Sequence, residues 1–133
     1  MKKLMTVGLL TLACFGLNLA AQDWYHDRDG RFQGEGWRGH LFEHVRVDLE
    51  YVMRGGLPPG KEARRLENTK RELRDLQAKL EANRFDQGEL NDVIDSVRKS
   101  ANDDRLPPRD KEVLRDDLNR LIDYRDHHEH WIR

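Results

Sequence analysis

The sequence predicts an all-α protein: three to four antiparallel amphipathic helices, as a helical hairpin or small bundle, in one small domain, residues 37–133. Three observations predict this fold. Apolar residues recur at three- and four-residue spacing over several long stretches, which is the period of one helix face. Segments rich in Gly and Pro, "RGGLPPGK" and "SANDDRLPP", separate these stretches and stop helices. Charged residues make up 37% of the chain, so each helix has a narrow apolar stripe and an otherwise hydrated surface.

The first segment, residues 1–21, is predicted to be a secretory signal peptide. Lys2 and Lys3 precede an uncharged apolar run that ends in the small residues Ala20 and Ala21. Two alternatives stay open: an uncleaved N-terminal membrane anchor, since the run approaches the length of a short membrane-spanning helix, and lipidation of Cys14. We expect cleavage after Ala21, giving an exported protein, periplasmic or extracellular, that does not insert into a membrane.

Removal of the signal would change the chemistry open to the chain. The mature segment loses Lys2 and Lys3 but no acidic residue, which leaves 22 basic against 25 acidic residues. It also loses Cys14, the only cysteine, and with it disulfides, thiol catalysis and cysteine-ligated metal. Leu, Ile, Val and Phe form about a fifth of the mature segment, close to the level at which chains stay disordered. A thin core of this kind would benefit from a protein partner or from self-association.

Residues 22–36 are predicted to form a flexible arm that contains glycines and aromatic residues but no sustained period. Its aromatic side chains Trp24, Tyr25 and Phe32, together with Trp131 near the C-terminus, are candidates for contacts with another protein.

The helical domain begins with a predicted helix over residues 37–53. Its apolar stripe consists of Trp37, Leu41, Val45, Leu49 and Val52. The next helix is predicted over residues 61–83, where leucines recur every seven residues at Leu66, Leu73 and Leu80, with Thr69 and Leu76 between them. This narrow seam predicts a helix that contacts its neighbours along a line.

Two further helices complete the prediction. The third begins after Asp86, a natural N-cap that is followed three residues later by Glu89, as in a capping box. The fourth runs over residues 108–130, with Pro108 tolerated in its first turn.

Two groups of histidines are candidates for metal binding. His40, His44 and Asp48 follow one another at four-residue spacing, which places them on one flank of a helix. The letters "HLFEH" also match a zinc-peptidase motif, but four short helices offer little room for a substrate cleft, and we set that activity aside. Zinc or copper could bind these imidazoles; the other interpretation is that they border the apolar stripe and seal the core.

The second group lies at the C-terminus, where His127, His128 and His130 form a short His-rich tract that could also bind metal. The other interpretation is a helix end, where histidine suits the negative pole of the helix dipole.

The function we expect is non-enzymatic: a small exported helical protein, without a cofactor, that acts through protein–protein contacts in the cell envelope. The alternative is an exported metal-binding or metal-sensing protein that uses the clustered histidines. Nucleic acid is an improbable partner, because arginines alternate with acidic residues and no basic stripe results.

Overall fold

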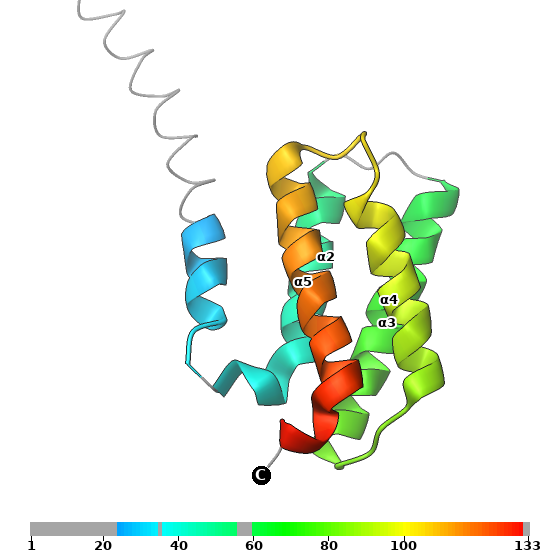
Figure 1. Ribbon diagram of the computed structural model, residues 1–133. Helices are drawn as coiled ribbons and strands as arrows, with labels where there is room; N and C mark the ends of the chain where they lie inside the picture. Colours follow the sequence, from blue (N-terminus) through cyan, green and yellow to red (C-terminus); the bar gives the residue numbers. More distant parts are fainter. Residues whose placement is uncertain (1–23, 35, 56–59, 132–133) are drawn as a thin grey trace, which may run out of the picture. The chain divides into compact units, whose positions relative to one another are not determined.

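The computed structural model describes residues 24–34, 36–55 and 60–131, and all regular structure in these residues is helical (Figure 1). The predicted all-α fold is therefore confirmed. The predicted signal peptide lies outside the described residues. The chain divides into two compact units, Met1–Glu35 and Gly36–Arg133, which are described separately below. None of the helices in the described ranges is long and apolar enough to cross a membrane.

The first unit contains a helix over residues 24–31, where the sequence predicted no regular element. One contact in this segment joins side chains at helical spacing: the Arg28 guanidinium lies 4.6 Å from the centre of the Phe32 ring, four residues on. The neighbouring residues Trp24 and Tyr25 also pack edge-to-face at 5.1 Å between ring centres. An i,i+4 pair supports a helical turn without an apolar stripe, so a search for hydrophobic periodicity overlooks it.

The second unit consists of short 3₁₀ helices at its two ends and four longer α-helices between them. These are η1 (Gly36–His40), α2 (Leu41–Arg54), α3 (Lys61–Glu81), α4 (Gln87–Ala101), α5 (Pro108–His127) and η2 (His128–His130). The predicted helices agree with α2 to α5 to within a few residues, except that the first and last turns are 3₁₀. Gly36 and Gly39 have low helix propensity, which disfavours a regular α-helical start at this end.

The four α-helices of the second unit contact one another in a ring: α2 packs against α3 and α5, and α4 packs against α3 and α5 (Figure 1). The apolar stripes meet in the middle. The largest side chains with less than 2% exposure are Leu41, Phe42, Val45, Leu49, Val52, Leu66, Leu73, Leu90, Val93, Ile94, Leu114 and Leu121. Six of them, on α2 and α3, lie in the stripes expected from sequence spacing: Leu41, Val45, Leu49, Val52, Leu66 and Leu73.

An aromatic cluster lies at the end of the second unit where η1 and η2 meet. Trp131 packs edge-to-face on Trp37 and on Tyr124, both at 5.2 Å between ring centres. Tyr124 also packs on Phe42 at 5.2 Å, which joins the cluster to the core of α2. Edge-to-face pairs of this kind stabilise beyond their buried area. The cluster therefore seals one end of the helical unit.

Candidate functional site

Of the first group of predicted metal ligands, the structure places His40 and His44 near each other. The ring centres of His40 and His44 are 6.3 Å apart, with His40 exposed on η1 and His44 partly exposed on α2. Asp48 is fully buried. Within the residues that the structure describes, no three or more His, Cys, Asp or Glu side chains gather so as to hold a metal ion.

The C-terminal histidines have different surroundings from one another. His128 stacks in parallel on Phe85, with ring centres 3.7 Å apart, and so extends the aromatic cluster. The Nδ1 atom of His127 lies 3.5 Å from the Asp123 carboxylate. His130 is exposed on η2. The stacking of His128 on Phe85 and the contact of His127 with Asp123 account for the positions of these two histidines without a metal.

The candidate protein-contact residues are divided between the two units. Trp24, Tyr25 and Phe32 belong to the first unit, where Trp24 and Tyr25 are partly exposed and Phe32 is buried. Trp131 belongs to the second unit and is buried in the aromatic cluster, with 9% of its surface exposed. Among the described residues the large apolar side chain with the greatest exposure is Phe85, at 36%.

A polar groove of about 310 Å³ lies on the second unit between α3 and α4. Its lining residues are Arg65, Asn68, Thr69 and Glu72 of α3 and Asp92, Asp95, Ser96 and Lys99 of α4. The groove forms where the apolar seam is interrupted by small polar side chains.

Hydroxyl groups form the floor of the groove. The Oγ atoms of Thr69 and Ser96 are hydrogen bonded at 2.7 Å, and both side chains are buried. Thr69 also donates to the Arg65 carbonyl at 2.9 Å, and the Arg65 Nη2 donates to the Ser100 Oγ at 2.8 Å. Because residues that follow one another on α3 meet residues in descending order on α4, the two helices run antiparallel along the groove.

Charge is segregated along the groove. Arg65 and Lys99 lie at one end, and Glu72 and Asp92 at the other. Burial raises the pKa of Glu72 above its usual value, and the nearby charge of Asp92 raises it further. At the opposite end the Arg65 Nε is buried and has no hydrogen-bond partner among the described residues. The acidic end therefore favours a cation, and the basic end offers a donor to an anion.

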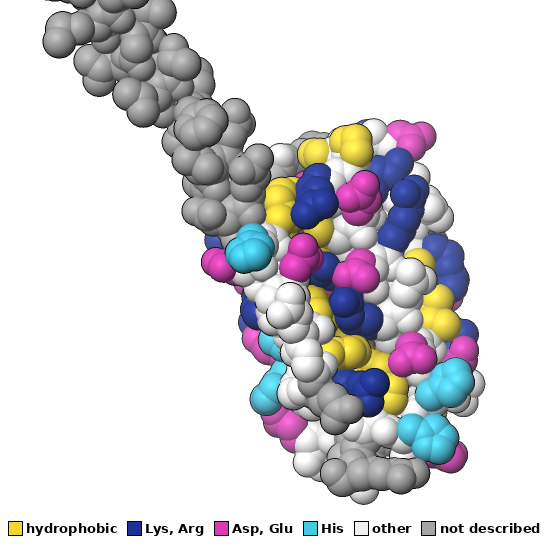
Figure 2. All heavy atoms as spheres, turned by 60° about the vertical axis from the view of Figure 1, so that its left-hand side comes forward, with side chains coloured by type: hydrophobic (Ala, Val, Ile, Leu, Met, Phe, Trp, Pro, Cys, Tyr) yellow, Lys and Arg dark blue, Asp and Glu magenta, His cyan; other side chains and the backbone are white. Residues whose placement is uncertain are grey.

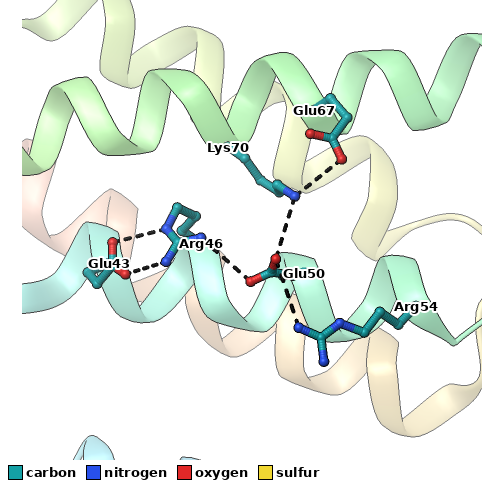
Figure 3. Close-up of polar contacts among 6 residues, drawn as sticks. All are labelled: Glu43, Arg46, Glu50, Arg54, Glu67 and Lys70. Carbon is teal, nitrogen blue, oxygen red and sulfur yellow. Dashed lines mark hydrogen bonds and ion pairs between the residues drawn. The ribbon is translucent and has the colours of Figure 1, made fainter.

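The charged side chains of α2 form a ladder of ion pairs (Figure 3). This ladder has less capacity to bind a ligand than the α3/α4 groove. Arg46 donates two hydrogen bonds to Glu43 and lies 3.5 Å from Glu50. Glu50 in turn approaches Arg54 at 3.9 Å and, on the neighbouring helix α3, Lys70 at 4.0 Å. Opposite charges alternate along this ladder, and exposed pairs of this kind contribute little stability each.

A second charged cluster joins the end of α3 to the start of α4. The Nζ of Lys79 lies 2.9 Å from Asp75, 2.8 Å from Asp86 and 3.4 Å from Glu89, and these carboxylates raise the Lys79 pKa. Burial raises the pKa of Glu89 to about 6, and the hydrogen bond with Asp75 adds to the rise. The Asp86 Oδ1 also accepts from the backbone N–H of Glu89 at 3.0 Å, which confirms the predicted N-cap of α4.

Sequence reasoning did not identify the α3/α4 groove. The available signal was the polar interruption of two apolar stripes. Thr69 stands one heptad before Leu76 in the leucine seam of α3, and Ser96 and Ser100 lie between apolar residues on the inner side of α4. Small polar residues of this kind are usually interpreted as substitutions that a core tolerates. Only the arrangement of α3 against α4 shows that Thr69 and Ser96 meet.

The chain matches no protein-family model, no curated protein and no solved structure. The fold and the groove describe an all-helical protein with a charge-segregated polar groove on its second unit.

Proposed function

We propose that this chain is an exported, non-enzymatic helical protein that acts through contacts with other proteins in the cell envelope. The observation that supports the proposal is the α3/α4 groove, where a hydroxyl floor lies between a basic and an acidic end. A polypeptide segment can complement such a groove, because its amide N–H groups can donate to the hydroxyl oxygens of the floor and its charged groups can pair with the two ends.

A binding role fits the groove better than a catalytic one. Thr69 and Ser96 hydrogen bond to each other, and no histidine or cysteine stands among the eight lining residues. A hydroxyl nucleophile needs an adjacent base to activate it. Figure 2 shows another face of the molecule, where basic and acidic side chains intermingle with small hydrophobic patches between them.

The remaining parts of the proposal concern arrangement and location. The ring of contacts among α2, α3, α4 and α5 supports an antiparallel four-helix bundle as the domain of residues 37–133. Export is proposed from the signal-peptide pattern of residues 1–21. The thin core supports self-association or a partner as a source of further stability.

Site-specific photocrosslinking in the native cell envelope tests the proposal. A photoreactive residue at Asp95, whose side chain is 65% exposed at the groove, should form one main protein adduct. The same probe at Arg115, exposed on α5, should not. The partner identified from the adduct should bind the purified chain, and Lys99→Glu should weaken that binding. Equal crosslinking from both positions, or binding unaffected by Lys99→Glu, would contradict the proposal.

Metal binding is a second candidate, favoured by the 6.3 Å separation of the His40 and His44 rings. Two imidazoles supply half of a tetrahedral zinc site, so a second copy or a partner would have to supply the rest. Equilibrium dialysis with zinc or copper tests this. Stoichiometric sub-micromolar binding that is lost in His40→Ala/His44→Ala would support the metal site. Binding unchanged in that variant would exclude these histidines.

A further inference from the structure

The charged ends of the α3/α4 groove are a fixed distance apart. Arg65 and Glu72 are separated by seven positions on α3, and Lys99 and Asp92 by seven positions on α4. At about 1.5 Å of rise per residue, the two ends of the groove are roughly 10 Å apart along the helix axes. A ligand that satisfies both ends must carry a cation and an anion at about this separation.

An extended peptide with free termini meets this requirement. Each residue of an extended chain spans about 3.3–3.6 Å, so roughly three residues place an α-amino group and an α-carboxylate at the required distance. The volume of about 310 Å³ suits a molecule of this size and is small for a longer chain. Both termini of such a peptide are charged at neutral pH.

We propose that the α3/α4 groove binds short peptides of about three residues through their two free termini. This inference rests on the binding role proposed for the groove, and it names a free peptide, in place of a segment of a protein partner, as the ligand. The carboxylate of the peptide lies between the Arg65 guanidinium and the exposed Lys99 ammonium, the two positive charges that line this end of the groove. The amino group lies between Glu72 and Asp92, and the hydroxyls of Thr69 and Ser96 face the central amides.

The remaining charge in the groove does not oppose this arrangement. Asp95 lies midway along the groove and is paired with Arg98, whose Nη1 is 3.1 Å from its carboxylate. Asn68 also lines the groove; its Oδ1 accepts from the Arg71 Nη2, and its amide NH₂ can donate. The raised pKa of Glu72 is consistent with an acidic end that lacks a strong counter-cation of its own.

Isothermal titration calorimetry with trialanine tests the proposal on the purified chain. Trialanine should bind, and N-acetyl-trialanine amide, which lacks both charges, should bind at least roughly tenfold more weakly, since charge-assisted hydrogen bonds are lost at each end. Lys99→Glu should weaken trialanine but change little for the C-terminal amide. Asp92→Lys should weaken trialanine but change little for the N-acetyl peptide. Both substitutions are at exposed positions, where they leave the core intact.

Matched charge reversals on α5 serve as controls. Arg115→Glu and Glu112→Lys change the net charge equally at exposed positions outside the groove, and trialanine binding should be unchanged in both. Equal binding of the blocked and free peptides would overturn the proposal. An absence of trialanine binding would also overturn it. If crosslinking at Asp95 nevertheless persists, the groove binds a protein segment and the broader proposal stands; if both fail, both are wrong.

Discussion

At the scale of single residues, polar side chains in apolar seams account for much of the chemistry of this molecule. Thr69 and Ser96 each stand among leucines, valines or isoleucines, and both are buried, at 2% and 8% exposure. Their hydroxyls hydrogen bond across the α3/α4 interface, so neither polar group is buried without a partner. The pair creates the groove floor at little cost in stability, because a satisfied buried hydroxyl is tolerated in a core.

The first prediction concerns this pair. Thr69→Val keeps the shape of the side chain but removes the hydroxyl, which leaves the Ser96 Oγ without its partner on α3. We expect the free energy of unfolding, measured in urea, to fall by about 1–3 kcal/mol. Adding Ser96→Ala should restore part of this loss, because no unpaired hydroxyl is left. A double variant whose loss equals the sum of the two single losses would show that the hydroxyls are independent.

The second prediction concerns the N-cap of α4. Asp86→Asn keeps a side-chain oxygen for the Glu89 N–H but removes the charge that faces Lys79, whereas Asp86→Ala removes both. Since Asn and Asp cap equally well, the Ala variant should be about 1 kcal/mol less stable than the Asn variant in urea. Equal stability of the two variants would mean that the cap contributes nothing.

The third prediction is the pH dependence that Glu89 contributes. Burial raises its pKa to about 6, from 4.5. Between these values the folded chain binds the Glu89 proton more tightly than the unfolded chain does, so this group lowers stability as the pH rises through that range. Glu89→Gln should remove this contribution. The stability of the variant relative to the parent should therefore increase from pH 4.5 to pH 6 in chemical denaturation, and a constant difference would contradict the assignment.

At the scale of helices, a side chain of one helix caps the end of another helix that is distant in the sequence. The helix α2 has no side-chain cap of its own at His40. Gln77, buried on α3, takes this role: its Oε1 accepts from the Glu43 N–H at 3.2 Å, and its Nε2 donates to the Gly39 carbonyl at 2.8 Å. One amide of α3 thus satisfies both the η1 carbonyl and a first-turn N–H of α2, groups that helix ends leave open.

The fourth prediction follows from this cap. Gln77→Met keeps the length of the side chain and removes both hydrogen bonds, and we expect a loss of about 1–2 kcal/mol in thermal or urea unfolding. Gln77→Glu keeps the acceptor for Glu43, loses the donor to Gly39 and to the Glu81 carboxylate, and places a negative charge beside both acceptors, so its loss at neutral pH should be at least as large as that of Gln77→Met. If both variants unfold like the parent, the cap is not a source of stability.

The helices also show how far the sequence predicts this structure. The ends of α3 and α5 and the N-cap of α4 follow from local signals: Pro108 in a first turn, Asp86 before Glu89, and the apolar stripes. The Gln77 cap and the Thr69–Ser96 pair join residues 34, 38 and 27 positions apart, and no local pattern specifies such partners. The groove was missed for the same reason: it exists only once two helices face each other.

At the scale of the whole molecule, the balance of charge and core composition depends on the first segment. The chain carries 24 basic and 25 acidic residues, and two of the basic residues, Lys2 and Lys3, belong to the predicted signal. The single cysteine, Cys14, also lies there. If export removes residues 1–21, what remains is a cysteine-free helical protein that relies on apolar burial and polar caps in an oxidising compartment, without disulfides.

The fifth prediction tests this processing. When the full chain is expressed in a bacterial host, we expect it in the periplasmic fraction with Gln22 as its first residue, because small residues at Ala20 and Ala21 follow the apolar run. Intact mass and N-terminal sequencing identify the cut, and a maleimide should find no thiol. An uncleaved anchor would instead keep Met1 and a reactive thiol in the membrane fraction. A lipoprotein would begin at an acylated Cys14. Each alternative has its own mass and its own compartment, so one fractionation experiment distinguishes all three.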